Sequence, residues 1–230
     1  MNHLNIDITS YEIQGETILR DIQMIVNSDD RIAIVGANGA GKTTFLKILC
    51  GLIGEYTGSI ENIGGISLGY LEQIHFMDES ITVREDLRNA FTEIRQLEQV
   101  IASEEEKMLE TGEYEAYTEA LDRFQLIGGY TYENEIDRVA RGIGIWHILD
   151  KTLAEVSGGE RTKIALVKIL VSRPDFLLLD EPTNFIDLVS VEWLEKYLAN
   201  TWKGGYMIIS HDRAFLDATC EITMDVRGAR

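Results

Sequence analysis

A glycine-rich segment, GANGAGKTT at 36–44, follows a short apolar run and precedes an amphipathic stretch. The run at 31–35 is typical of a buried strand, and the stretch at 44–52 is typical of a helix. Glycines allow the backbone N–H groups of such a loop to curl around an anion, and the start of the following helix favours the same charge. A strand, a tight loop and a helix in this order therefore predict a phosphate site. The alternative, a glycine-rich turn that matches by chance, does not explain the flanking strand and helix.

The segment matches the phosphate-binding pattern G-x-x-x-x-G-K-[ST]. In this pattern the lysine reaches the β- and γ-phosphates of a nucleotide, and the hydroxyl after it ligates Mg²⁺. We therefore expect Lys42 to contact phosphates and Thr43 to bind the metal. The residues expected to cradle the phosphates are Gly36, Ala37, Asn38, Gly39, Ala40 and Gly41.

A second apolar run, FLLL, ends in two adjacent carboxylates, Asp180 and Glu181. Parallel strands buried on both faces read as continuous apolar runs, and ligands of such sheets bind at the carboxyl ends of the strands. Asp180 is placed to hold Mg²⁺ through water, and Glu181 to orient and deprotonate an attacking water. An ordinary acidic turn before Pro182 is the alternative, and it is weak beside a phosphate-binding loop.

The remaining pattern indicates alternating α/β structure with a helical insertion. Residues 6–26 read as strand, turn and strand with Gly15 at the break, and 59–71 as two short strands. From about 82 to 148, apolar residues recur at helical spacing. The further expected elements are helices at 160–171 and 188–198, a short helix from 212, and strands at 175–179, 206–210 and 222–226.

The charge of the chain limits its partners. A formal net charge of −18 disfavours broad contact with nucleic acid or anionic lipid. The most acidic region, 84–122, favours a solvated helical face. The two cysteines and four histidines lack the spacing of a disulfide framework or a metal site. Without a signal-peptide pattern or a long apolar run, the expected location is cytoplasmic.

Five motifs together resemble the ATP-binding cassette (ABC) family, in the order that the family shows. They are the loop GANGAGKTT, Gln73 of YLEQ at the Q-loop position, VSGGE for the signature LSGGQ, LLLDEP for Walker B with its catalytic glutamate, and His211 of ISHDR at the switch position. Val156 and Glu160 depart mildly from the signature. The resemblance covers nearly the whole chain.

The resemblance implies a P-loop NTPase fold. The expected cassette has a mainly parallel core sheet, an antiparallel β subdomain and a helical subdomain. It would form a single domain over 1–230, with the helical insertion at about 82–172. The implied activity is the hydrolysis of ATP to ADP and phosphate with Mg²⁺.

Further roles follow from the same resemblance. Gln73 would sense Mg²⁺ and the attacking water, His211 would contact the γ-phosphate, and Thr44 would help to hold the α-phosphate. Tyr11 would stack on adenine, although a purely structural tyrosine at the end of a strand is the alternative. Stacking tolerates other bases, so GTP stays open as a substrate.

The signature implies a paired cassette. Ser157, Gly158 and Gly159 open a helix and would form a second anion site, which in ABC proteins serves the ATP of the opposite cassette. Asp187, at the D-loop position, would line the same interface. We therefore expect ATP to drive pairing with a second cassette, and hydrolysis to separate the two.

The subfamily that the chain most resembles is ABC-F, whose usual Walker B continuation is DEPTNHLD. Here DEPTN is followed by Phe185 and Ile186 in place of His-Leu. YLEQ, SHDRAFLD and the segment LDRFQLIGGYTY agree with ABC-F. ABC-F proteins carry two cassettes and no transmembrane domain, and many act on the ribosome in translation or antibiotic resistance.

The resemblance to ABC-F implies a first cassette of a ribosome-associated factor. Its partner would be a missing second cassette or another copy of the chain. No long insertion is evident between Gln73 and Ser157, only a helical stretch at 83–139. The alternatives are the energy-coupling subunit of a membrane transporter and a regulatory module that does not turn over.

Overall fold

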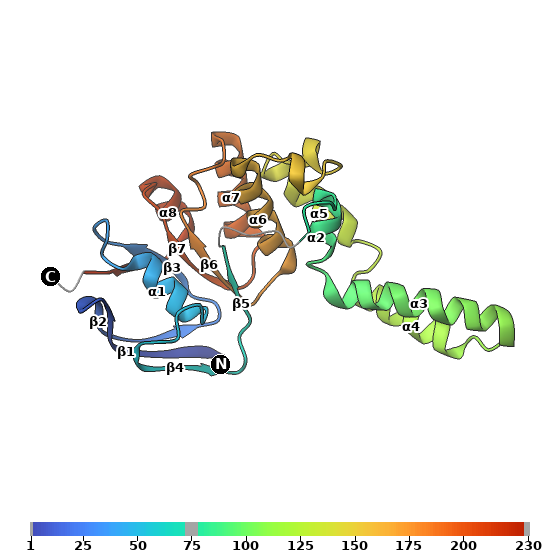
Figure 1. Ribbon diagram of the computed structural model, residues 1–230, viewed down its shortest axis with the longest axis horizontal. Coiled ribbons are helices and arrows are strands. Elements are labelled where there is room, and N and C mark those ends of the chain that lie inside the picture. The colour runs from blue at the N-terminus through green and yellow to red at the C-terminus, as the bar shows by residue number, and fades with distance from the viewer. Residues whose placement is uncertain (1, 72–77, 228–230) are drawn as a thin grey trace. The chain divides into compact units, whose positions relative to one another are not determined.

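The computed structural model describes residues 2–71 and 78–227, which divide into two compact units (Figure 1). One unit comprises Met1–Gln73 and Arg173–Arg230, and the other is Ile74–Ser172. The predicted α/β class, with one parallel sheet, one antiparallel sheet and a helical part, is confirmed. That 1–230 forms a single domain with an insertion at about 82–172 stays a prediction.

An antiparallel sheet of the first unit has the order β2–β1–β4. Its strands are β1 (His3–Ile13), β2 (Glu16–Asn27) and β4 (Thr57–Ile63). Side chains of a strand point alternately to its two faces, and Leu4, Ile6 and Ile8 of β1 are accordingly buried. Gln14 and Gly15 both have positive φ, 52° and 82°, as a two-residue hairpin turn requires. The predicted break at Gly15 is confirmed.

A parallel sheet of five strands forms the core of the same unit, in the order β5–β6–β7–β3–β8. The strands are β5 (Leu68–Tyr70), β6 (Phe176–Asp180), β7 (Gly205–Ile209), β3 (Arg31–Val35) and β8 (Ile222–Asp225). All of β7, and β6 up to its last residue, are buried, which explains their continuous apolar runs. The two short strands expected at 59–71 both exist, but β4 and β5 belong to different sheets.

The helices of this unit are α1 (Lys42–Leu49), α7 (Leu188–Asn200) and α8 (Arg213–Thr219). α1 begins at Lys42, before the amphipathic stretch at 44–52, because its first turn is polar and the apolar periodicity begins only at Phe45. Asp187 and Asp212 are the N-caps of α7 and α8, where each carboxylate accepts a backbone N–H bond. These caps fix where both helices begin.

In the second unit, the regular elements of the described residues 78–172 are helices, and one isolated β-bridge joins Thr82 and Thr152. The unit contains α2 (Val83–Arg88), α3 (Thr92–Thr111), α4 (Glu115–Leu126), α5 (Tyr132–Gly142), α6 (Gly158–Ser172) and two 3-10 turns, Trp146–Ile148 and Leu153–Glu155. α3 and α4 form an antiparallel hairpin, because Arg123 near the end of α4 pairs with Glu93 at the start of α3, 2.8 Å apart. Gly112 ends α3 with φ 76°, in the left-handed region where glycine is favoured.

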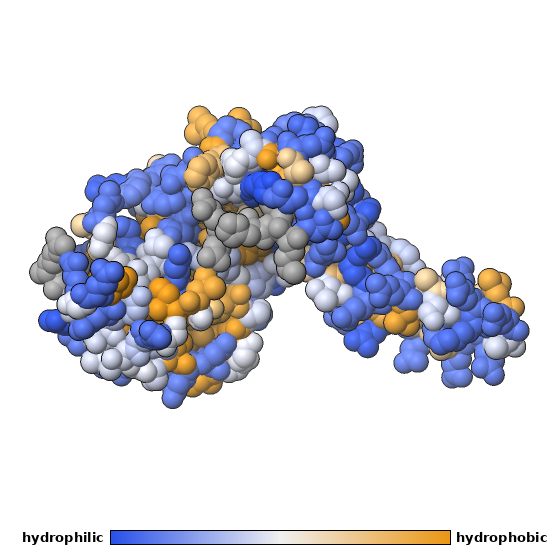
Figure 2. All heavy atoms as spheres, viewed as in Figure 1, coloured by the Kyte–Doolittle hydropathy of each residue, from blue (hydrophilic) through white to orange (hydrophobic). Residues whose placement is uncertain are grey.

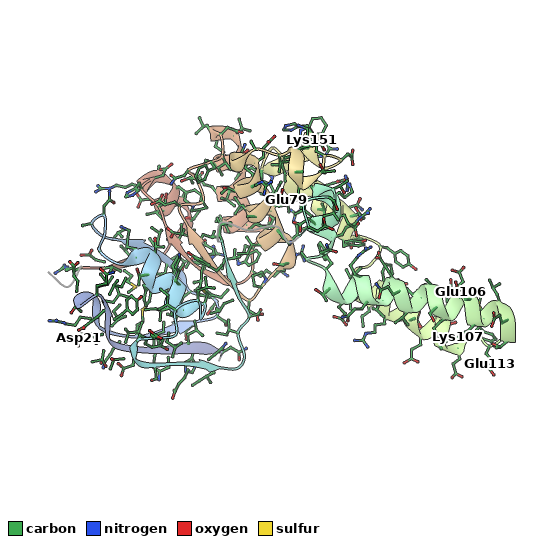
Figure 3. All side chains as sticks on the ribbon, viewed as in Figure 1. Asp21, Glu79, Glu106, Lys107, Glu113 and Lys151 are labelled. Atoms are coloured by element: carbon green, nitrogen blue, oxygen red, sulfur yellow. The ribbon has the colours of Figure 1, made fainter. Side chains whose placement is uncertain are left out.

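The hairpin surface is mostly hydrophilic in the view of Figure 2, with hydrophobic side chains near its turn. Leu109, 78% exposed, lies in the last turns of α3. Glu106, Lys107 and Glu113 are labelled on the hairpin in Figure 3, and Lys107 pairs with Glu104. Most of the acidic region 84–122, expected to be a solvated helical face, thus belongs to this hairpin, and its start lies in α2.

Arginine–carboxylate pairs join α2, α3 and α5. Glu133 of α5 accepts hydrogen bonds from Arg84 and Arg88 of α2, and Arg95 of α3 binds Glu85 of α2 at 2.6 Å. These side chains are between a quarter and about a third exposed. Linked charges hold geometry better than an isolated surface pair does, so we expect them to fix the root of the hairpin.

Candidate functional site

The predicted phosphate loop connects the end of β3 to the start of α1. Gly36 has φ 149°, and a Cβ there would lie 2.3 Å from the backbone oxygen of Val226. No other residue fits this position without moving the chain. Lys42, the first residue of α1, folds back so that Nζ donates to the carbonyl oxygens of Gly36 and Ala37, each at 3.0 Å.

The donor set of this loop fits a nucleotide phosphate. The first turn of α1 carries no acidic side chain, and it contains the Lys42 ammonium and the hydroxyls of Thr43 and Thr44. Unpaired N–H groups at the start of a helix bind anions. The loop residues Asn38, Gly39, Ala40 and Gly41 lie between β3 and α1, as predicted.

The two adjacent carboxylates stand at the carboxyl end of β6. Asp180 is its last residue and pairs with Ile209 of β7. Glu181 follows with φ 50°, a left-handed conformation that is uncommon for a residue other than glycine. Its N–H donates to the Ile209 carbonyl at 2.8 Å, which fixes this turn of the chain. Backbone strain of this kind gathers at functional sites.

Glu181 contacts His211. One carboxylate oxygen lies 3.3 Å from His211 Nε2, and the other accepts the His211 backbone N–H at 3.3 Å. The Glu181 side chain is 19% exposed and that of His211 is 66% exposed. The structure therefore brings together two residues that are thirty positions apart in the sequence.

Two hydroxyls support this pair. Thr183 Oγ1 and Ser210 Oγ lie 3.3 Å apart, and Ser210 Oγ accepts the Asp212 N–H at 3.1 Å. Ser210 is buried. These contacts join the segment after β6 to the segment after β7, and the sequence analysis missed both residues. Their closeness in the sequence to Glu181 and His211 is the signal that could have identified them.

Two cavities adjoin the phosphate loop. One, of about 370 Å³, is lined by residues that include Gly36, Lys42, Ser210 and His211. The other, of about 520 Å³, has walls formed by Glu16–Ile18, Ala37–Ala40 and Asp225–Val226–Arg227. Nothing local in the sequence links the first and last of these walls to the loop, so neither was predicted.

Tyr11 lines neither of these cavities and lies half-buried against the hydrophobic core of the first unit. Its stacking on adenine stays a prediction. Gln73, expected at the Q-loop, lies outside the described residues.

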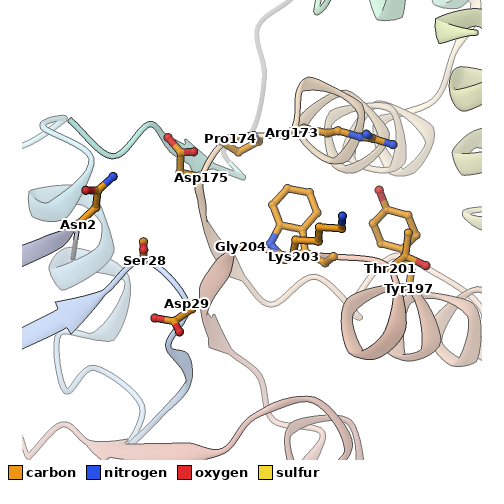
Figure 4. A pocket seen from close by; sticks show the side chains of 11 residues that line it. Asn2, Ser28, Asp29, Arg173, Pro174, Asp175, Tyr197, Thr201, Lys203 and Gly204 are labelled. Atoms are coloured by element: carbon orange, nitrogen blue, oxygen red, sulfur yellow. The ribbon is translucent and has the colours of Figure 1, made fainter. Parts of the chain in front are cut away.

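A further cavity of about 580 Å³ lies near the amino ends of the parallel strands β6 and β7 (Figure 4). Its lining includes Asp175 and Gly204, which immediately precede β6 and β7. Arg173, Lys203 and Asp29 also line it. None of the predicted site residues contributes to this lining. Ligands of parallel sheets bind at the carboxyl ends of the strands, so the loop side is the candidate site.

The residues predicted to hold Mg²⁺ are Thr43, Gln73 and Asp180. Gln73 lies outside the described residues, and the other two offer hard oxygen donors, a hydroxyl and a carboxylate. Among residues 2–71 and 78–227, no group of three or more His, Cys, Asp or Glu side chains could hold a metal ion. A nucleotide-bound Mg²⁺ does not need such a group, because phosphate oxygens and water complete its shell. The donor chemistry of Thr43 and Asp180 therefore fits Mg²⁺ bound with a nucleotide.

The signature segment begins α6. Gly158 and Gly159 are its first residues, and Ser157 immediately precedes them. The Ser157 N–H and Oγ–H both donate to Glu160, at 2.7 Å each. These bonds lower the pKa of Glu160, the Oγ–H bond more than the N–H bond. The Glu160 carboxylate is therefore ionised at neutral pH.

Asp187 has a local structural role. Its side chain accepts the Ser190 N–H at 3.0 Å as the N-cap of α7. Around it, Phe185, Leu188 and Val189 are 52%, 74% and 75% exposed. Large apolar side chains exposed together favour a contact with another chain.

The part of the chain that the structure describes contains no helix long and apolar enough to span a membrane.

Comparisons with known proteins agree with this geometry. The chain is 40% identical over 233 residues to the Bacillus subtilis ATP-binding protein YdiF, an alignment that covers 98% of the chain and 36% of YdiF. It is 35% identical to the energy-dependent translational throttle protein EttA of Haemophilus influenzae, over 87% of the chain and 36% of EttA. It is 33% identical to the tylosin resistance ATP-binding protein TlrC of Streptomyces fradiae, over 92% of the chain and 40% of TlrC. The chain thus spans well under half of each relative.

The resemblance to ABC-F is confirmed, because EttA and TlrC are ABC-F proteins. A solved structure titled as the ATP-binding subunit of an ABC transporter is similar in fold, with a TM-score of 0.70 and 21% identity over 97% of this chain and 85% of that one. The family model described as ABC transporter matches residues 19–184. The chain therefore belongs to the ABC family of ATP-binding cassettes.

Proposed function

We propose that the chain is the ATP-hydrolysing cassette of an ABC-F type protein that works in the cytoplasm with the translation machinery. Membership of the ABC family implies an ATPase domain. One observation carries the catalytic assignment: Lys42 and His211 line one cavity, and Glu181 contacts His211. The names of EttA and TlrC, a translational throttle and an antibiotic resistance protein, support the ribosomal assignment.

Different residues of the chain would bind ATP, activate the attacking water and hold Mg²⁺. Lys42 binds two loop carbonyls, so its ammonium is already held at the phosphate loop, where it would contact the β- and γ-phosphates. Glu181 would take a proton from the attacking water. His211, which now contacts the Glu181 carboxylate, would orient it and contact the γ-phosphate. Thr43 and Asp180 would hold Mg²⁺, which neutralises phosphate charge when bound.

In this proposal, hydrolysis of ATP also requires a second cassette. Ser157, Gly158 and Gly159 would contact the triphosphate held by the partner, and Asp187 would lie at the same interface. The exposed Phe185, Leu188 and Val189 beside Asp187 support such an interface. Tyr11 and Gln73 keep the roles that the resemblance implies for them.

Light scattering of the Glu181→Gln chain tests the pairing. Without the general base, ATP should persist, so a dimer mass should accumulate in MgATP and disappear in ADP. A strictly monomeric mass under saturating MgATP would refute pairing of this chain with itself.

Co-sedimentation with ribosomes tests the ribosomal assignment. We expect ribosome contact through the full-length protein, because the net charge of −18 disfavours broad RNA contact by the cassette itself. The full-length protein with Glu181→Gln should therefore pellet with ribosomes in MgATP and not in ADP. If it stays in the supernatant while the cassette still pairs in MgATP, the ribosomal assignment is wrong and the ATP chemistry stands. The transporter alternative, which shares that chemistry, would then be favoured.

A further inference from the structure

The hydroxyl of the signature serine donates a hydrogen bond to a carboxylate. Ser157 N–H and Oγ–H both donate to the same carboxylate oxygen of Glu160, at 2.7 Å each, and the Glu160 N–H lies 3.4 Å from Ser157 Oγ. This is the arrangement of a capping box at the start of α6. Position 160 is the point at which the chain replaces the glutamine of the family signature with a carboxylate.

This bond opposes the role proposed for Ser157. A hydroxyl has one proton to donate, and a phosphate oxygen can only accept. While the hydroxyl donates its hydrogen bond to Glu160, the serine oxygen has only lone pairs facing an approaching phosphate and cannot donate to it. To bind the triphosphate of a partner, Ser157 must break a charge-assisted bond, which is stronger than one to a neutral acceptor.

The negative charge of Glu160 adds a second opposition. The pKa of Glu160 lies below its usual value because of the two Ser157 bonds, with smaller contributions from Lys151 and His147. The carboxylate therefore stays charged, and it repels a phosphate brought to Ser157. A glutamine at this position would keep an acceptor for the serine and remove the charge.

We propose that Glu160 is a positioning residue that withholds the Ser157 hydroxyl from the triphosphate of the paired cassette and so keeps ATP-dependent pairing weak and readily reversed. This inference rests on the proposed function. It predicts that Glu160→Gln strengthens pairing, although the same change weakens the local cap.

The chain offers a matched control five residues earlier. Thr152 N–H and Oγ1–H both donate to one oxygen of Glu155, at 2.7 Å and 2.8 Å, in another capping box. These bonds lower the pKa of Glu155 as well, with the backbone bond as the larger cause. Glu155→Gln removes the same charge from the same kind of cap, at a site with no proposed contact to nucleotide.

The experiment compares three chains by sedimentation velocity in MgATP: Glu181→Gln alone, with Glu160→Gln added, and with Glu155→Gln added. Glu160→Gln should lower the dissociation constant of the dimer about tenfold, the difference between a charge-assisted and a neutral hydrogen bond. Glu155→Gln should change it less than about twofold, as expected for a solvent-screened charge that is bonded to Thr152 and not to Ser157. Adding Ser157→Ala should reduce the gain from Glu160→Gln, because the part that acts through the Ser157 bond is lost and only the relief of charge repulsion remains.

The outcomes separate this inference from the proposed function. If Glu181→Gln dimerises but Glu160→Gln leaves the dissociation constant unchanged or raises it, the inference is wrong and the proposed function stands. An equal gain from Glu155→Gln would also overturn it, since bulk charge would then be the cause. A chain that stays monomeric in every variant would refute pairing of this chain with itself and, with it, this inference. Thermal melting should show a similar small loss for both cap variants, so a gain in pairing cannot come from greater stability.

Discussion

Replacing Gly36 with alanine should disable the phosphate loop from its first residue. The new Cβ would lie 2.3 Å from the Val226 backbone oxygen, and a backbone atom cannot rotate aside as a side chain would. Val226 N–H donates to the Val35 carbonyl at 2.8 Å, so the contact could be relieved only by disturbing the end of β8. The backbone of Gly36 itself, at φ 149°, is also unsuited to alanine.

The magnitude follows from these contributions. Backbone strain at an unsuitable φ costs about 1–3 kcal/mol, and loss of the Val226 hydrogen bond costs about 1 kcal/mol. We therefore expect Gly36→Ala to lower the free energy of unfolding by about 2–4 kcal/mol. Binding of a fluorescent ATP analogue should fall at least tenfold, because the loop that would receive the phosphates is displaced.

Gly39→Ala is the matched control. Gly39 also has positive φ, 77°, but no atom lies within 4 Å of an added Cβ. Alanine there should cost only the left-handed backbone preference, about 1–2 kcal/mol. Urea denaturation of both variants measures the difference. If Gly36→Ala is no more destabilising than Gly39→Ala, the close approach to Val226 does not constrain the loop and the reasoning fails.

Three further predictions concern side chains outside the loop. Asp86, buried in α2, binds Lys168 of α6 at 2.7 Å. Asp86→Ala should therefore lower the free energy of unfolding, measured by urea denaturation, by about 2–3 kcal/mol. This loss is smaller than that for a fully buried pair because Lys168 is partly exposed. Asp187→Ala should cost about 1 kcal/mol as a lost N-cap, whereas Asp187→Asn should keep the cap, so any loss of ATP-dependent pairing in the asparagine variant reports on the interface. Hydrogen bonds from Ser67, the side-chain bond before the backbone bond, lower the pKa of Asp175. The stability from this contact is therefore complete above the unfolded pKa of about 3.9 and is lost as the pH falls through the lower folded pKa, and Asp175→Asn should flatten the pH dependence of unfolding below about pH 4.

The elements that the sequence predicted well carry their signal locally. The buried runs of β6 and β7 mark strands that are covered on both faces, and the Gln14–Gly15 turn marks the β1–β2 hairpin. The order of the strands had no such signal. β4 and β5 are separated by four residues, yet they join different sheets, because the chain leaves one sheet at Gly64–Gly65. The hydrophobic pattern of a segment identifies it as a strand but does not indicate which strand it pairs with.

The same distinction holds at the site. Lys42, Asp180 and Glu181 were predicted because each sits in a motif that follows a strand ending at the ligand side of the sheet, whereas His211 was predicted from the resemblance to the ABC family. The hairpin of α3 and α4 was predicted only as helical, because its turn at Gly112 resembles any glycine within a polar stretch. A helix end is fixed by backbone geometry, and sequence patterns mark it poorly.

The walls of the cavity beside the phosphate loop show why the remainder was out of reach. Residues 225–227 reach the loop because β8 is the edge strand next to β3, a pairing between residues about 190 positions apart. That pairing brings the Val226 oxygen against Gly36, so the glycine that opens the motif is required by a residue near the other end of the chain. The sequence therefore predicts which residues carry the chemistry, whereas the reason that the first loop residue must be glycine lies in the order of the strands.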